Sequence, residues 1–171
     1  MGFDAVMRDE AVAFLKAHQP LPPDEDLPQR LIEQFDEARR YFEAHPDPEA
    51  ASLLLGSLGN GTGFGVYQLV PDALHAQDRE TVVQALIEAL KAGPPSVRTW
   101  SMEFALEYPD PHLDRHAIAM LESPLRDDRY WAAAYLIERG SKVPASLIDV
   151  ARRGETDDEL VEILDELQAK S

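Results

Sequence analysis

Two histidines at helical spacing come closest to a metal-binding motif in this chain. His112 and His116 are four residues apart, which would place both imidazoles on one face of a helix, as in a zinc-binding pair. The glutamate of an H-E-x-x-H motif is missing, and a third ligand such as Asp110 is close only in sequence. We therefore expect no metal site and no cofactor, and we interpret the pair as two solvated histidines on a surface helix.

Carboxylates are abundant, but no motif marks a catalytic pair among them. Acid–base hydrolysis of the glycosidase type needs two carboxyls held about 5–10 Å apart in a cleft, with separated pKa values. A serine nucleophile elbow and the kinase motif set are also missing from the sequence. The sequence therefore predicts no catalytic residues, and we expect that the protein is not an enzyme.

The charge balance indicates the class of partner. The 171 residues include 32 acidic and 16 basic ones, which gives a formal net charge of −16. Nucleic acids and anionic membranes are bound through clustered Lys and Arg, so this charge argues against both and favours a basic protein partner. Neither a signal peptide nor an apolar run of about 18 residues is recognisable, and there is no cysteine. We expect a cytoplasmic protein, and the sequence leaves its oligomeric state open.

One long segment, residues 50–71, carries no charged residue and no histidine. Its centre, residues 56–65, holds five of the nine glycines, at a spacing that fits neither a dinucleotide-binding fingerprint nor a P-loop. Two interpretations stay open. The segment is either a flexible connection with Phe64 and Tyr67 packed on the core, or a recognition loop that presents Asn60, Thr62 and Phe64 to a partner.

Apolar residues recur at helical spacing through most of the chain, and strand alternation is not convincing anywhere. Capping residues and glycine or proline stops divide the pattern, with Asp26 expected to cap the second helix and Asp78 a later one. The expected helices cover roughly residues 3–18, 26–42, 47–58, 78–92, 96–108, 111–122, 127–139, 144–153 and 157–169.

An internal repeat of 31 residues runs through the second half of the chain. Arg98-Thr99-Trp100 recurs as Arg129-Tyr130-Trp131, and a weaker third copy follows at a spacing of 30. A period of this length with two helices per unit is typical of a solenoid. The sequence predicts an all-α fold, a short α-α superhelix of about nine or ten helices. We expect one domain over residues 1–171, with N-terminal helices in 1–66 and repeat helices in 67–171, and with Trp100 and Trp131 both buried.

The second helix of each repeat carries a recognisable pattern, V-R-T-W-S-M-E-F-A over residues 97–105 and D-R-Y-W-A-A-A-Y-L over residues 128–136. This pattern resembles the V-R-x-x-A-A-x-x-L signature of HEAT-like repeats of the bacterial kind, and the resemblance covers about residues 78–139. It implies an α-solenoid whose second helices line the concave face. It also implies that Arg98 and Arg129 bond to a neighbouring helix or to the Asp of an adjacent repeat.

Acidic residues on these second helices suggest a binding surface. The candidate partner-binding residues are Glu103, Glu107, Tyr130, Glu138, Glu162, Asp165 and Glu166. The alternative is that the acidic segment 155–166 is only a solvated terminal helix that caps the solenoid. The sequence leads us to expect a protein-binding solenoid, an immunity protein that neutralises a basic bacterial toxin. The alternative function is that of a generic HEAT-like adaptor or regulatory scaffold.

Overall fold

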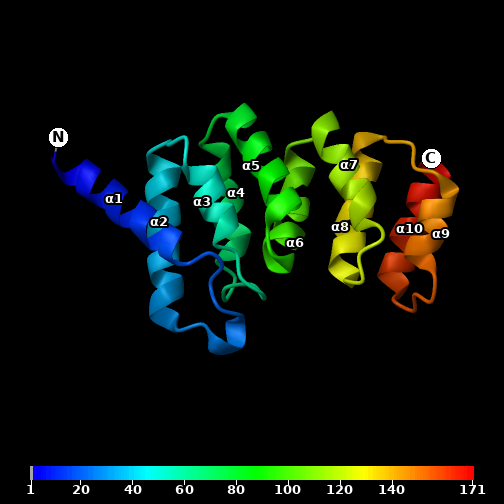
Figure 1. The fold of residues 1–171 in the computed structure, drawn as a ribbon, viewed down its shortest axis with the longest axis horizontal. Coiled ribbons are helices and arrows are strands. Elements are labelled where there is room, and N and C mark those ends of the chain that lie inside the picture. The colour runs from blue at the N-terminus through cyan, green and yellow to red at the C-terminus, as the bar shows by residue number, and fades with distance from the viewer. Residues whose placement is uncertain (1) are drawn as a thin grey trace. The chain divides into compact units, whose positions relative to one another are not determined.

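The computed structural model describes residues 2–171, with side chains from Met7 onward, and the regular secondary structure in this part of the chain is entirely helical. It holds ten α-helices and three short 3₁₀ helices and no strand, so the all-α prediction is confirmed (Figure 1). The chain packs as two compact units: unit 1 ends at Val97, and unit 2 is Arg98–Ser171. The boundary lies inside a helix, α6, and the single-domain expectation stays a prediction.

Unit 1 is built from helices that pack on helices one or two places further along the chain. α1 contacts α2 and α3, α2 contacts α4, and α3 contacts α5. The fully buried side chains between them include Leu15, Phe35, Leu54 and Leu86. The α-helices of this unit are α1 Gly2–Ala17, α2 Gln29–Ala44, α3 Ala50–Gly56, α4 Val70–His75 and α5 Arg79–Ala92, followed by the start of α6 Pro95–Phe104, and its 3₁₀ helices are Asp24–Asp26 and Tyr67–Leu69.

The start of α5 follows the sequence prediction, whereas the start of α2 does not. Asp78 caps α5 by accepting a hydrogen bond from the backbone N–H of Thr81 at 2.9 Å. Asp26, expected to cap α2, instead ends the 3₁₀ helix Asp24–Asp26. Pro28 directly precedes α2, and its φ of −63° suits the entry into the helix. The first helix has the expected extent. The sequence predicts Phe3 on the apolar face of this helix, and Phe3 lies outside the described side chains.

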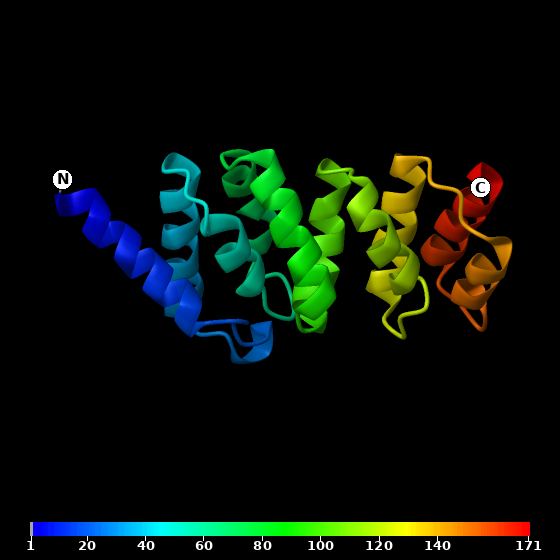
Figure 2. The same ribbon diagram turned by 45° about the horizontal axis from the view of Figure 1, so that its top comes forward.

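Unit 2 is centred on one helix, α8 Arg126–Arg139, which packs against α7, α10 and a 3₁₀ helix that continues α6. Gly140 ends α8 in the left-handed conformation with φ 64°, which glycine adopts without strain. Figure 2 shows these helices as successive antiparallel pairs. The other elements of the unit are the 3₁₀ helix Ala105–Glu107, α7 Pro111–Met120, α9 Ala145–Arg152 and α10 Asp158–Lys170.

The 31-residue repeat is visible in the burial of the side chains. Residues 97–107 and 128–138 show the same order of buried, half-buried and exposed positions. Glu107 and Glu138, for example, are both exposed. Trp100 and Trp131 are both half-buried, so the prediction that they are buried is wrong.

Trp100 and Trp131 are only half-buried because of where their indoles lie on the helices. The buried apolar residues of α8 begin one residue later, at Ala132, and its large buried ring belongs to Tyr135. Trp131 lies at the edge of that face, where its ring meets Tyr130 edge-on at a centroid distance of 5.0 Å. Trp100 lies beside Phe104, with the two ring planes tilted by 37° and the ring centroids 5.5 Å apart.

The third copy of the repeat is as weak in structure as it is in sequence. Leu113 lies inside α7, whereas its counterpart Val143 precedes α9. Asp128 is buried, whereas its counterpart Asp158 is exposed at the first residue of α10. The last helical pair therefore packs on α8 without repeating the detailed positions of the earlier pairs.

Candidate functional site

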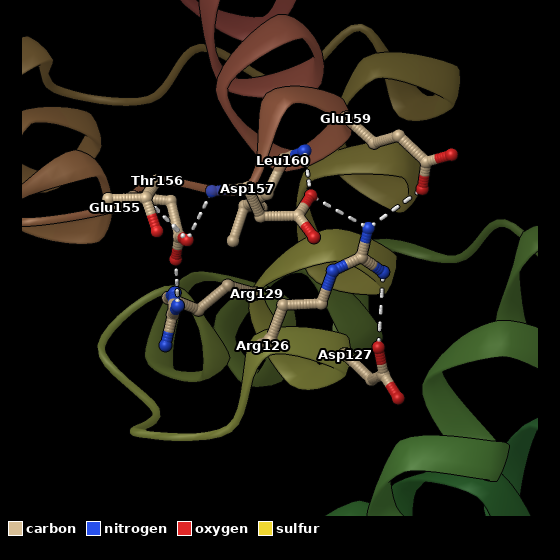
Figure 3. Close-up of polar contacts among 8 residues, drawn as sticks. All are labelled: Arg126, Asp127, Arg129, Glu155, Thr156, Asp157, Glu159 and Leu160. Carbon is tan, nitrogen blue, oxygen red and sulfur yellow. Dashed lines mark hydrogen bonds and ion pairs between the residues drawn. The ribbon is translucent and has the colours of Figure 1, made fainter.

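The beginning of α8 is joined to the beginning of α10 by Arg126, as Figure 3 shows. Its guanidinium donates to Asp127 at 3.1 Å, to Asp157 at 3.0 Å and to Glu159 at 2.9 Å. Asp157 also caps α10 by accepting a hydrogen bond from the backbone N–H of Leu160 at 2.9 Å. The Arg126 hydrogen bond and this cap hold the pKa of Asp157 below its usual value. These acids therefore serve internal pairing.

A second arginine, Arg129, joins α8 to the same segment (Figure 3). It pairs with the carboxylate of Glu155 and donates to the backbone carbonyl of Ser123 at 2.8 Å. Glu155 also accepts from the backbone N–H groups of Thr156 and Asp157, each at 2.9 Å. Arg129 thus contacts the next helical pair, although its partner there is a glutamate and not the Asp that the HEAT-like resemblance implies.

The buried carboxylate of Asp128 fixes α8 against the unit 2 part of α6. It is 1% exposed. It accepts hydrogen bonds from the hydroxyl groups of Thr99, on α6, and Ser123, at 2.6 Å from the latter. A buried carboxylate with two donors is a structural element, and it sets the register of the two second helices.

Three of the predicted acidic residues lie on these neighbouring second helices. Glu103 is half-buried on α6, Glu107 is exposed on the 3₁₀ helix that continues it, and Glu138 is exposed on α8. Because α8 packs on that 3₁₀ helix, we treat the three as one surface, the acidic face.

Glu103 is the chemically unusual member of the acidic face. Its carboxylate makes no hydrogen bond or ion pair with the described part of the chain. Burial, with a further contribution from the negative charge of Asp127, raises its pKa to about 7. A partly desolvated carboxylate beside another acid is stabilised as an anion when a cation approaches.

The acids that were predicted on α10 are a weaker part of the site. Glu162 is exposed, but Asp165 pairs with Arg152 of α9, and Glu166 pairs with Lys170 at 2.6 Å. Pairing with bases of the same unit reduces the charge that a partner would meet. The terminal helix therefore fits the capping interpretation.

Tyr130, the aromatic member of the predicted surface, is held within unit 2. The guanidinium carbon of Arg126 lies 4.9 Å from the centroid of its ring, in a cation–π contact. The ring also meets Trp131 edge-on. One face of Tyr130 is thus occupied by the arginine that joins α8 to α10.

The glycine-rich segment of unit 1 is a structured loop, which we call the Phe64 loop (residues 60–65). The carboxylate of Asp24 accepts hydrogen bonds from the backbone N–H groups of Thr62 at 2.9 Å and Gly63 at 2.8 Å, and from the Thr62 hydroxyl at 3.2 Å. The carbonyl of Asn60 accepts from the backbone N–H of Asp24 at 3.0 Å. The loop is therefore fixed along its backbone, and no strand forms there.

Phe64 points away from the core, contrary to the interpretation that packs it there. Its side chain is 59% exposed, and its φ of 53° lies in the left-handed region that non-glycine residues rarely adopt. Tyr67 is fully buried, as that interpretation expected. Asn60 and Thr62 are exposed beside Phe64, so the structure places all three residues of the alternative site on one loop.

The candidate metal ligands do not gather into a site. His112 lies 2.8 Å from the carboxylate of Asp110, measured from Nδ1, and Arg115 donates to His116 at 3.3 Å. Among the described residues, no group of three or more histidine and carboxylate side chains is placed to hold a metal ion.

No protein-family model, curated protein or solved structure matches the chain. The HEAT-like resemblance therefore depends on the repeat and on the helices that carry it. In the described part of the chain, no helix is both long enough and apolar enough to cross a membrane.

Proposed function

We propose that this chain is a cytoplasmic HEAT-like repeat protein that binds a basic protein through the acidic face. In its most specific form, the proposal is that the chain is an immunity protein that neutralises a basic bacterial toxin by direct binding. The formal net charge of −16 supports a basic partner, because complementary charge speeds encounter and excludes acidic surfaces.

The observation that carries the proposal is the state of Glu103. Arg126, Arg129 and Arg152 of unit 2 are engaged by acids of the same unit, whereas the Glu103 carboxylate has no such partner within the described residues. A lysine or arginine from a second protein would supply the missing cation. The exposed carboxylates of Glu107 and Glu138, at matching places of successive repeats, would extend the contact along the same face.

The alternative is a generic adaptor or regulatory scaffold, which would use the same acidic face. The two functions differ in their consequence for the partner. An immunity protein abolishes the activity of its partner, whereas an adaptor leaves that activity intact or redirects it.

Co-expression tests the proposal. The product of the gene next to that of this chain is expressed in a sensitive bacterial host, alone and together with the chain, and growth is measured. The immunity proposal expects a basic, toxic product and restored growth on co-expression. A toxic product that the chain binds without restoring growth favours the adaptor, and a product that the chain does not bind contradicts both.

Two matched variants place the binding site. The acidic-face variant combines Glu103→Gln, Glu107→Lys and Glu138→Lys, with glutamine at 103 because that position is half-buried. The control variant combines Glu88→Gln, Glu122→Lys and Asp149→Lys, three exposed positions that make the same total change in charge. Loss of protection in the acidic-face variant alone supports the acidic face as the binding site. Equal loss of protection in both variants would mean that net charge, and not this surface, accounts for it.

A further inference from the structure

The Phe64 loop combines an exposed aromatic side chain with a rigid support. Phe64 is the one non-glycine residue with positive φ among the described residues, and the Asp24 carboxylate holds the two residues before it. Turns within the loop add to this support: the backbone N–H groups of Gly65 and Tyr67 donate to the carbonyl of Thr62 at 3.0 and 3.2 Å. The ring is therefore presented in a fixed place, which lowers the entropy lost when it binds.

The glycines on either side of Phe64 show which side of the loop is packed. A Cβ atom at Gly63 would lie 2.7 Å from the Tyr67 ring and 2.9 Å from Ile32, so the inner side is filled. At Gly65 a Cβ atom would meet nothing within 4 Å. The outer side of the loop is open, and Phe64 is found there.

Charge around the loop indicates the chemistry of what it meets. Residues 50–71 are uncharged, whereas Glu25 and Asp26 are exposed directly after Asp24, which holds the loop. The surface is thus an aromatic side chain with acidic neighbours. Aromatic side chains that fill pockets are common centres of binding energy in protein interfaces, and charged groups around them set the choice of partner.

We propose that the Phe64 loop is a second docking element, in which Phe64 enters an apolar pocket with a basic rim on the partner protein. This inference rests on the proposed function, because it takes the partner to be the same basic protein. It concerns unit 1 and does not depend on the acidic face of unit 2.

Photocrosslinking tests the placement directly. The probe is p-benzoylphenylalanine at position 64, with the same probe at position 125 as control, because Leu125 is also an exposed apolar residue, in unit 2. Full-length chains are irradiated in the cells that produce them, and the crosslinked peptide is mapped on the captured protein. We expect a crosslink from position 64, and none from position 125, to a pocket of apolar residues edged by lysine or arginine.

Affinity measurements with the captured, purified protein complete the test. Phe64→Ala is expected to weaken binding about 30-fold or more, the loss typical of a central aromatic contact. Asp24→Ala, which releases the loop but keeps the ring, is expected to weaken it less, and Leu125→Ala to leave it unchanged.

The outcomes separate this inference from the proposed function. If the affinity of the basic partner falls for the acidic-face variant and is unchanged for Phe64→Ala, the loop proposal is overturned and the proposed function stands. A crosslink from position 64 to a second copy of this chain or to lipid, or no crosslink from that position, also overturns the loop proposal.

Discussion

Arg129 and Glu155 join two successive helical pairs of unit 2, since the guanidinium on α8 pairs with a carboxylate in the segment that leads into α10. Both side chains are largely covered, at 14% and 12% exposed. Glu155→Ala would leave Arg129 covered without its acid, which destabilises a protein more than the loss of an exposed pair. We expect a clear loss of unfolding free energy in urea for Glu155→Ala and a much smaller one for the exposed control Glu159→Ala.

The same pair gives an acid dependence with a definite sign. The backbone hydrogen bond from Asp157 and then the Arg129 contact hold the pKa of Glu155 below its usual value. Its contribution to stability is therefore present above the unfolded-state pKa, about 4.3, and is lost as pH falls through the lower folded-state value. Equal loss of stability in Glu155→Ala and Glu159→Ala at neutral pH would contradict this account.

Glu103 predicts a pH dependence of the opposite kind. Its folded-state pKa of about 7 lies above its unfolded value, so stability is full below about pH 4.3 and falls as pH rises towards 7. Glu103→Gln should remove this dependence and raise the unfolding free energy at pH 8 by on the order of 1–3 kcal/mol, since one pKa unit corresponds to about 1.4 kcal/mol. The measurement is urea unfolding from pH 5 to 8, with Glu138→Gln as control. An unchanged pH profile for Glu103→Gln would show that the carboxyl is not desolvated.

Trp100 and Trp131 test the repeat itself. They are the only tryptophans, and they occupy half-buried positions of matching type in successive repeats. We expect Trp100→Phe and Trp131→Phe to show similar fluorescence emission and similar quenching by acrylamide, both between the values for buried and for free indole. One protected and one solvent-like tryptophan would contradict the structural equivalence.

The sequence was sufficient for most of the helices and for the repeat, because apolar spacing and caps such as Asp78 act within a few residues. It did not predict the short helix α4, Val70–His75, which the structure has in addition. The degree of burial of Trp100 and Trp131 could not be predicted from the sequence, because the repeat shows that the two positions match without showing how far into the core they reach. The exposure of Phe64 could not be predicted either. It follows from hydrogen bonds between Asp24 and two residues far along the chain, Thr62 and Gly63.

The pairing of acids was the least predictable part of the site. Glu155, Asp157 and Asp165 look like Glu103 in the sequence, yet their carboxylates are engaged by arginines of α8 and α9. Which acid finds a base depends on how neighbouring helices pack. The one available signal was the implied role of Arg129, whose contact with an acid of the next pair the structure shows.

Asp24 should control the order of the Phe64 loop. Asp24→Ala removes the acceptor of the Thr62 and Gly63 backbone N–H groups, so we expect hydrogen exchange at these two amides to speed up by roughly tenfold to a hundredfold. Glu25→Ala, at an exposed neighbour, is the control and should leave both rates unchanged. Unaltered exchange in Asp24→Ala would mean that the loop is held by other contacts.

The central claim is that a basic protein binds the acidic face. The most direct test is the association rate constant of the neutralised basic protein, measured by stopped flow from low salt to about 0.15 M, where the Debye length is about 8 Å. We expect the wild-type chain to associate fast at low salt and more slowly as salt rises. The acidic-face variant (Glu103→Gln, Glu107→Lys, Glu138→Lys) should associate more slowly, and with less dependence on salt, than the control variant (Glu88→Gln, Glu122→Lys, Asp149→Lys). The same rate and salt dependence in both variants would contradict the claim.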